Sequence, residues 1–321
     1  MKKQPYSWAA LYWRVVAVPL VLLAPLAAAA QAPAPRRVQN PPEKGRIRVE
    51  VNLVNVIANV ADKNGRPVPD LPKEAFELLE EGTPQKIEVF EAETQQPLDL
   101  ALMIDSSLST VKEFAFEREA AAHFIRQVVR PGDRLAVFEF SDSVTQLTDF
   151  SSDVPLLQSA VRHMQEGAGT ALYDAVLLGS QALVKRNADR RRVLVLVTDA
   201  GETTSRADFD AARDAALRTG ALLYTIVIRP VKSEGGRNTA GEHALETITD
   251  TTGGAMYYPD SVTQLDAMFE RIDRELRTQY RLGYYPQSRA KGASFRRIEV
   301  RVKGDYTVRY RKGYFSVPAA E

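Results

Sequence analysis

Two apolar runs of strand length constrain the fold of this chain most strongly. They occupy residues 98–104 and 193–198, and the second reads VLVLVT. A strand that is apolar on both faces is typical of the centre of a parallel sheet, which helices cover on both sides. Each run is followed at once by an aspartate, Asp105 or Asp199. The two runs therefore predict an α/β sheet with a carboxylate at the end of each of two central strands.

Amphipathic helices and shorter strands alternate with these runs between residues 96 and 280. We expect helices at 111–129, 154–164, 171–185, 207–218, 242–249 and 262–278, and further strands at 135–140, 144–147, 221–228 and 255–258. Regular alternation of this kind is typical of parallel strands joined by right-handed crossovers. The sequence therefore predicts a doubly wound, mostly parallel α/β domain over residues 96–280.

The segments on both sides of this domain alternate at period two, which is typical of β-strands. They are an N-terminal unit at 47–95 and a C-terminal unit at 281–318, where Gly304-Asp305 is expected to close a hairpin between strands at 298–302 and 306–310. Neither unit is large enough to fold alone. We expect the two flanks to pair into one small β module, into which the α/β domain is inserted.

The first 30 residues have the features of a secretory signal peptide. A basic start precedes an apolar stretch at 15–26, and Ala28 and Ala30 suit the small-residue positions of a cleavage site. The alternative is an uncleaved membrane anchor, which the charge of Arg14 and two prolines in the stretch disfavour. Both interpretations place the bulk of the chain outside the cytoplasm, in the periplasm or the extracellular space.

Residues 31–46 are rich in proline and have no apolar periodicity, so they are expected to form a linker. No later apolar run is long enough to span a membrane. The chain has no cysteine, which excludes a disulfide framework and lipid attachment through cysteine. Its net charge is only +1, from 42 basic and 41 acidic residues, so a nucleic-acid partner is not expected.

Carboxylate and hydroxyl side chains gather where the apolar runs end. Asp105, Ser107 and Ser109 follow the first run, Asp199 follows the second, and Thr170 ends the glycine-rich segment GAGT. The carboxyl ends of parallel strands meet at one edge of a sheet, where ligands bind. Oxygen ligands suit hard divalent cations such as magnesium. These five residues therefore predict a metal site, although each of them alone is also a common turn or helix-cap residue.

At these residues the chain resembles the von Willebrand factor type A domain, a Rossmann-like fold that carries a D-x-S-x-S loop, a distant threonine and a distant aspartate. The flanking segments at 62–90, 280–286 and 296–315 resemble those of a VWFA-related family of exported bacterial proteins known mostly from acidobacteria. The resemblance implies a metal-ion-dependent adhesion site (MIDAS) that holds magnesium, or another divalent cation such as manganese or calcium.

The resemblance also implies individual roles. Ser107 and Ser109 would ligate the cation directly and Thr170 directly or through water, whereas Asp105 and Asp199 would act mainly through waters and hydrogen bonds. One departure from the pattern is that Ala-Gly-Glu follows Asp199, whereas in many relatives a glycine comes directly after this aspartate. A loop shifted by one residue would account for it, which leaves the role of Glu202 open.

Neutral hydroxyl ligands leave a bound cation able to accept a carboxylate from another protein. We therefore expect an exported, divalent-cation-dependent protein-binding module, of the adhesion or scaffold type, whose partner contributes an acidic residue. The alternative is a structural or assembly protein of the cell envelope in which the ion only stabilises the fold or is absent.

Catalysis finds little support in the sequence. His123, His163 and His243 fall on expected helices, and neither an H-E-x-x-H zinc motif nor a G-x-S-x-G nucleophile motif is present. A metal-dependent hydrolase would also need a positioned base. We therefore expect a protein that is not an enzyme.

Overall fold

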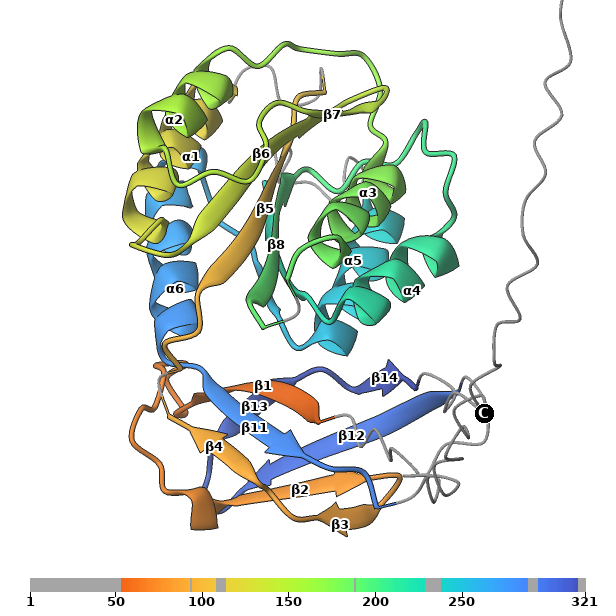
Figure 1. Ribbon diagram of the computed structural model, residues 1–321. Coiled ribbons are helices and arrows are strands. Elements are labelled where there is room, and N and C mark those ends of the chain that lie inside the picture. The colour runs from red at the N-terminus through yellow and green to blue at the C-terminus, as the bar shows by residue number, and fades with distance from the viewer. Residues whose placement is uncertain are drawn as a thin grey trace, which may run out of the picture. The chain divides into compact units, whose positions relative to one another are not determined.

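The computed structural model describes residues 53–92, 94–107, 114–187, 189–228, 238–287 and 294–316, all within one compact unit (Figure 1). The expected signal peptide at 1–30, the linker at 31–46 and the candidate ligand Ser109 lie outside these residues.

A six-stranded sheet forms the centre of the α/β domain. Its order is β10-β9-β8-β5-β6-β7, and every neighbouring pair is parallel except β6 and β7. Its strands are β5 (Leu98–Asp105), β6 (Arg134–Phe140), β7 (Val144–Gln146), β8 (Arg191–Thr198), β9 (Leu222–Val227) and β10 (Ala255–Tyr257). All residues of β5 are buried, as its apolar run predicts. The expected doubly wound, mostly parallel sheet is confirmed.

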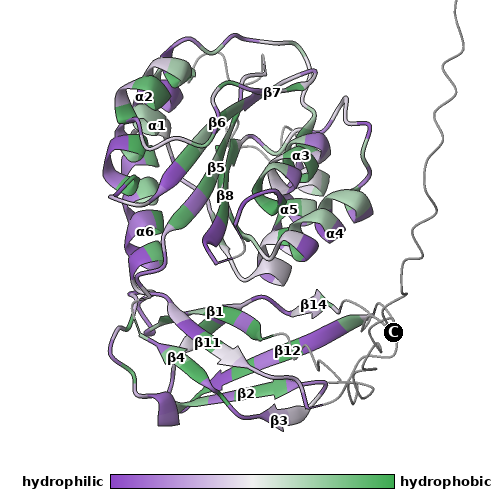
Figure 2. Cartoon of the chain, in the orientation of Figure 1, coloured by the Kyte–Doolittle hydropathy of each residue, from purple (hydrophilic) through white to green (hydrophobic). Residues whose placement is uncertain are grey.

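Helices cover both faces of this sheet (Figure 1). One face carries α1 (Phe114–Val128), α2 (Val154–Arg162) and α6 (Leu265–Arg277), and the other carries α3 (Leu172–Val184), α4 (Phe209–Thr219) and α5 (Thr239–Thr252). Figure 2 shows apolar strands β5 and β8 between helices of mixed polarity. Because both faces are covered, side chains at the strand ends are the ones left to form a site. Of the helices described, none is long and apolar enough to cross a membrane.

Local sequence signals set the ends of several helices. Asp153 and Asp208 are the N-caps of α2 and α4, and their carboxylates accept hydrogen bonds from the backbone N–H of Leu156 and Ala211 at 3.1 and 2.8 Å. Gly220 ends α4 with a φ of 65°, a left-handed conformation that glycine adopts without a steric penalty. These ends agree with the predicted helix positions to within two residues.

The flanks form two four-stranded antiparallel sheets, ordered β13-β1-β11-β4 and β14-β12-β2-β3. Their strands are β1 (Val54–Ala61), β2 (Phe76–Glu80), β3 (Thr83–Gln85), β4 (Val89–Glu91), β11 (Tyr280–Tyr284), β12 (Phe295–Val302), β13 (Thr307–Tyr310) and β14 (Gly313–Phe315). Short 3-10 helices occur at Lys73–Ala75 and Val262–Gln264. Each sheet contains strands of both flanks, and one apolar cluster draws on both sheets. The expected β module built from the two flanks is confirmed.

The hairpin expected around Gly304-Asp305 is wrong. Strand β12 pairs with β2 and β14, whereas β13 pairs with β1 in the other sheet. The chain crosses between the sheets at Gly304, which has a φ of 117° and where an added Cβ would lie 2.6 Å from the ring of Tyr306. Period-two alternation identifies strands but not their partners, and here β12 and β13 each pair with a strand of the N-terminal flank rather than with each other.

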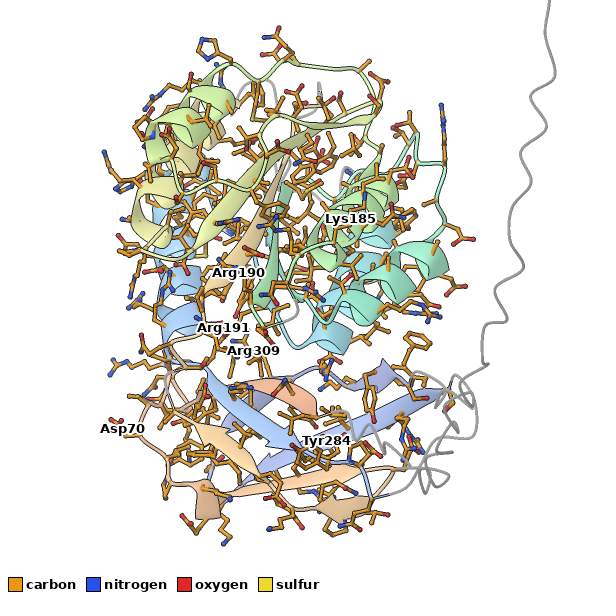
Figure 3. The ribbon with its side chains drawn as sticks, in the orientation of Figure 1. Asp70, Lys185, Arg190, Arg191, Tyr284 and Arg309 are labelled. Carbon is orange, nitrogen blue, oxygen red and sulfur yellow. The ribbon has the colours of Figure 1, made fainter. Side chains whose placement is uncertain are left out.

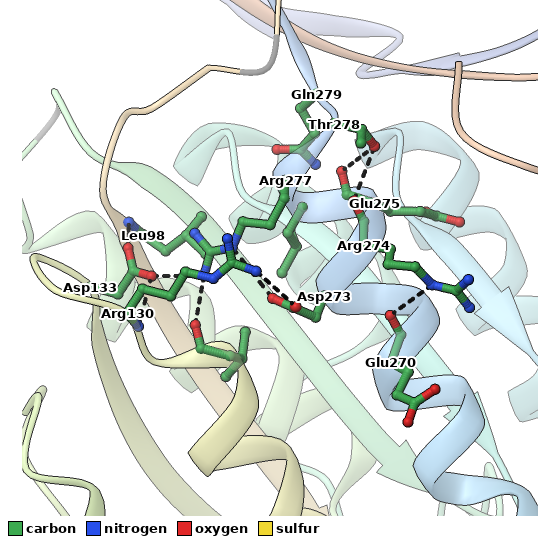
Figure 4. A network of polar contacts seen from close by, with 12 residues as sticks. Leu98, Arg130, Asp133, Glu270, Asp273, Arg274, Glu275, Arg277, Thr278 and Gln279 are labelled. Atoms are coloured by element: carbon green, nitrogen blue, oxygen red, sulfur yellow. Dashed lines mark hydrogen bonds and ion pairs between the residues drawn. The ribbon is translucent and has the colours of Figure 1, made fainter. Parts of the chain in front are cut away.

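A polar network anchors the beginning of β5 (Figure 4). Arg277, at the end of α6, donates to the Asp133 carboxylate at 2.8 Å and to the Val128 carbonyl at 2.6 Å, and pairs with Asp273 at 3.3 Å. Asp133 in turn accepts the N–H of Leu98, the first residue of β5, at 2.7 Å. These contacts fix the strand whose opposite end carries Asp105.

A second buried network joins the α/β domain to the β module. The Glu275 carboxylate of α6 accepts a hydrogen bond from the Tyr257 hydroxyl at 2.9 Å and pairs with Arg309 of β13 at 2.5 Å. Gln279 donates to Asn59 of β1 and to the Tyr224 hydroxyl, at 3.2 and 3.3 Å. Arg309 is labelled in Figure 3. The inserted domain is thus tied to the module by specific buried polar contacts as well as by the chain itself.

Candidate functional site

Asp105 lies fully buried at the carboxyl end of β5. Its carboxylate accepts a hydrogen bond from the Ser107 N–H at 3.0 Å and from the Thr198 hydroxyl at 2.6 Å. Burial raises the pKa of Asp105 to about 6 against the opposing effect of these hydrogen bonds, and the nearby charge of Asp199 raises this pKa further. A positive charge beside Asp105 would favour its ionised form.

Asp199 begins a tight turn directly after β8. Its side chain is largely buried and accepts the N–H of Gly201 at 2.7 Å. Ala200 between them has a φ of 64°, and its N–H donates to the Thr198 hydroxyl at 3.0 Å. Glycine adopts this left-handed conformation freely and alanine adopts it at a cost. Asp199 therefore sits at the strand end, followed by an alanine in a conformation typical of glycine.

Thr170 lies beside this turn. Its N–H donates to the Thr203 hydroxyl at 2.8 Å, and its carbonyl accepts the Thr203 N–H at 2.9 Å. A Cβ added at Gly201 would lie 2.9 Å from the Asp199 Oδ1 and 3.3 Å from the Thr170 Oγ1. The Thr170 hydroxyl and the Asp199 carboxylate therefore both lie against Gly201 and close to each other.

The loop after β5 reaches the same place. Ser107 is buried and forms a parallel bridge with Gly167, and the Ser106 carbonyl accepts the Gly167 N–H at 2.9 Å. This pairing sets the loop of Ser107 alongside the segment that ends in Thr170. Of the five predicted residues, the structure thus brings Asp105, Ser107, Thr170 and Asp199 to one edge of the sheet.

The donor set at this edge suits a hard divalent cation. It offers two carboxylates and two hydroxyls, all oxygen groups, and one of each lies against Gly201. Over the ranges that the structure describes, no group of three or more His, Cys, Asp or Glu side chains forms a conventional metal cluster. A cation held here would therefore depend on hydroxyl and water oxygens in addition to Asp105 and Asp199.

Glu202 and Ser205 fix the helix that follows Thr170. The Glu202 carboxylate and the Ser205 hydroxyl accept the Tyr173 N–H of α3 at 3.1 and 2.9 Å. In return, Asp174 of α3 accepts two backbone N–H groups just after Ser205, at 3.0 and 2.8 Å. The N-cap residue of α3 is Ala171, which has no side chain able to cap the helix. The sequence therefore indicates that the cap of this helix comes from another segment.

The beginning of α5 also lies against the site. The expectations from the sequence do not include this contact. The Asn238 side chain donates to the Asp199 carbonyl at 3.4 Å. A Cβ added at Gly241 would lie 1.9 Å from the Ala200 carbonyl oxygen. In the sequence, a glycine in the first turn of a helix is the feature that indicates such a close approach.

The three histidines make contacts on helices. The His123 ring contacts the Asp266 carboxylate at 3.0 Å, the His163 ring contacts the Ser159 carbonyl at 2.7 Å, and exposed His243 lies 4.0 Å from a glutamate one turn along α5. These contacts are those of helix-surface histidines.

Comparison with known proteins gives a family and a fold. The family model described as the von Willebrand factor type A domain matches residues 99–271. No curated protein sequence matches the chain. A solved von Willebrand factor type A protein from Catenulispora acidiphila is 12% identical, with a TM-score of 0.50 over 84% of this chain and 74% of that chain.

Two further solved structures match a smaller part of the chain. The vWF domain of the type V pili tip protein Mfa5 from Porphyromonas gingivalis is 12% identical, with a TM-score of 0.47 over 56% of this chain and 95% of that chain. The conserved hypothetical protein BatB from Bacteroides thetaiotaomicron is 13% identical, with a TM-score of 0.44 over 56% of this chain and 98% of that chain.

Proposed function

Because the chain belongs to the von Willebrand factor type A domain family, we propose that it is a protein-binding module that depends on a divalent cation. Its binding site is the carboxyl edge of the central sheet. The observation that supports this proposal most is the convergence at that edge of two carboxylates and two hydroxyls from three separate loops, those of Asp105 and Ser107, of Thr170 and of Asp199.

A divalent cation such as magnesium would supply positive charge at this site. Ser107 and Thr170 would offer it neutral oxygens, as would Ser109, which lies outside the described residues, and Asp105 and Asp199 would act mainly through waters and hydrogen bonds. Neutral ligands leave much of the positive charge uncompensated, so a carboxylate of a partner protein can complete the coordination. The partner therefore carries an exposed acidic residue.

The role is binding rather than catalysis, and the place is outside the cytoplasm. The acidic groups at the edge accept hydrogen bonds from backbone N–H or hydroxyl groups, as Asp105 does from Ser107 and Thr198. The signal-like first 30 residues support export to the periplasm or the extracellular space. An adhesion or scaffold protein of the cell envelope combines these features.

Thermal melting of the mature chain tests the metal site. Magnesium at 100 times its Kd should stabilise the wild type by about 2.7 kcal/mol, because it binds only the folded state, and a chelator should reverse the shift. Asp105→Ala and Asp199→Ala should abolish the response. Asp149→Asn, which removes an exposed charge after β7, should keep it. A wild type that melts at the same temperature with magnesium and with chelator would contradict the metal site.

Partner capture separates binding from a purely structural role. The wild-type chain should retain a protein from envelope or culture fractions in magnesium but not in chelator, and Asp105→Ala should not retain it in either. Capture that is equal under all three conditions would instead favour an envelope structural or assembly protein whose ion only stabilises the fold.

A further inference from the structure

One exposed carboxylate holds the turn that carries Thr170. Asp142, in the loop between β6 and β7, accepts the Ala168 N–H on Oδ2 at 2.9 Å and the Gly169 N–H on Oδ1 at 3.0 Å. Hydrogen bonds to an ionised acceptor are stronger than those between neutral groups. Each oxygen of Asp142 thus holds one of the two residues that precede Thr170.

The neighbouring residue extends the same contact. The Ser141 carbonyl accepts the Ala171 N–H at 2.7 Å, so the two residues before Thr170 and the one after it are all bonded to the β6–β7 loop. The approach is close, because a Cβ added at Gly167 would lie 2.1 Å from the Ser141 Oγ. The glycines of the GAGT segment allow this contact between two loops.

The remaining N–H of this turn points to the opposite loop. Thr170 donates its own N–H to Thr203, in the loop that begins at Asp199. The backbone of Thr170 is therefore held between the β6–β7 loop on one side and the Asp199 loop on the other. These contacts hold the backbone on both sides of Thr170 and so set the position from which its side chain projects.

We infer that Asp142 is a positioning residue of the metal site, which fixes the turn at 168–169 and thereby directs the Thr170 hydroxyl toward the cation. This inference rests on the proposed metal-dependent function. Both oxygens of Asp142 accept N–H groups, so its part is to place Thr170 rather than to ligate. Residues that orient metal ligands typically change metal affinity about 10-fold to 100-fold when they are replaced.

The exposure of Asp142 makes this role separable from folding. A substitution there opens no cavity and strands no buried partner, so the metal-free variants should keep the wild-type circular dichroism spectrum and melt within a few degrees of it. The loss should appear instead in the affinity for magnesium and in faster hydrogen exchange of the Ala168 and Gly169 amides.

Isothermal titration of the mature chain with magnesium tests the inference. Asp142→Asn keeps the shape of the side chain but turns an N–H donor toward a backbone N–H, and it should raise the Kd about tenfold or more. Asp142→Ala removes both acceptors and should have at least the same effect. Glu166→Gln is the matched control, because it removes an exposed charge next to Gly167 that accepts no N–H from the turn. Its Kd should stay close to that of the wild type.

Each result bears on a different statement. A wild-type Kd in Asp142→Asn and Asp142→Ala, with magnesium bound by the wild type, would overturn the inference and leave the proposed function intact. Equal weakening by Glu166→Gln would also overturn it, since the effect would then be one of general charge. Failure of the wild type to bind magnesium would overturn the proposed function and this inference together.

Discussion

At the scale of single residues, the Asp199 turn depends on a strained alanine and a glycine pressed against it. Ala200 has a φ of 64°, a conformation that costs an L-residue about 1–2 kcal/mol. It is retained because the Thr198 hydroxyl accepts its N–H, while its carbonyl faces the first turn of α5 at Gly241. A side chain at Gly241 would push on backbone atoms that cannot move away cheaply.

Gly241→Ala should therefore destabilise the protein and disturb the site. The added Cβ would lie 1.9 Å from the Ala200 carbonyl oxygen, and relief of such overpacking typically costs about 1–3 kcal/mol. Urea unfolding measures the loss, and magnesium titration should show weaker binding because Asp199 is displaced. Ala240→Ser, at the exposed preceding position, is the control and should unfold like the wild type. A Gly241→Ala variant of wild-type stability would show that α5 does not press on this turn.

At the scale of elements, several ion pairs join the two flanks. Ion pairs connect acids or a lysine of the N-terminal flank to residues of the C-terminal flank at Lys63–Asp305, Glu77–Arg301, Glu80–Arg296, Glu81–Arg297 and Glu91–Arg281. Most of them are solvent-exposed, and exposed pairs contribute little to stability. The pair of Glu80 and Arg296 differs because Glu80 is buried and also accepts hydrogen bonds from the hydroxyls of Tyr284 and Tyr314.

Two neighbouring arginines of β12 allow a direct comparison. Arg296→Met would leave Glu80 buried without its cation, which typically costs about 3–5 kcal/mol. Arg297→Met removes only an exposed pair with Glu81 and should cost less than about 1 kcal/mol. Urea unfolding of both variants measures the difference, and the double variant Glu80→Gln, Arg296→Met should recover part of the loss. Similar losses in the two single variants would contradict a special role for the buried pair.

At the scale of the whole molecule, buried tyrosines of the inserted domain and the β module link the stability of the folded protein to pH. Burial raises the pKa of Tyr224, Tyr257 and Tyr284 well above its usual range, and it raises the pKa of Tyr314 to about 12. Tyrosine in an unfolded chain ionises near pH 10. The unfolded chain therefore loses tyrosine protons before the folded protein does, so stability is full below about pH 10 and falls as the pH rises above it.

The pH dependence of unfolding tests this link. The free energy of unfolding should fall above pH 10, by about 1.4 kcal/mol per pH unit for each fully buried tyrosine. Tyr224→Phe keeps the ring and loses only the hydroxyl that accepts from Gln279, so its slope should be shallower by about that amount. Urea unfolding at a series of pH values between 8 and 11 measures both slopes. Equal slopes would mean that ionisation of Tyr224 does not oppose folding.

Much of the candidate site was predictable because its residues stand at strand ends. An apolar run followed by Asp105 or Asp199 already specifies a parallel strand and the edge at which it ends, and four of the five predicted residues gather there. Asp142 and Asn238 were not predictable in the same way. Their contacts join loops that are far apart in the sequence, and a surface aspartate or asparagine has no pattern that distinguishes a loop contact from ordinary solvation.

The pattern of residue types predicts the central parallel sheet, the β character of both flanks and the oxygen-rich edge of the sheet. These properties follow from hydrophobic periodicity and residue type, which act within a few residues. Three other features follow from long-range packing: β12 and β13 belong to different sheets, Ala200 takes a left-handed conformation, and Asp142 holds the Thr170 turn. Each of these depends on which strand edges and backbone N–H groups the rest of the folded chain leaves unpaired, a property of the whole molecule rather than of a local pattern.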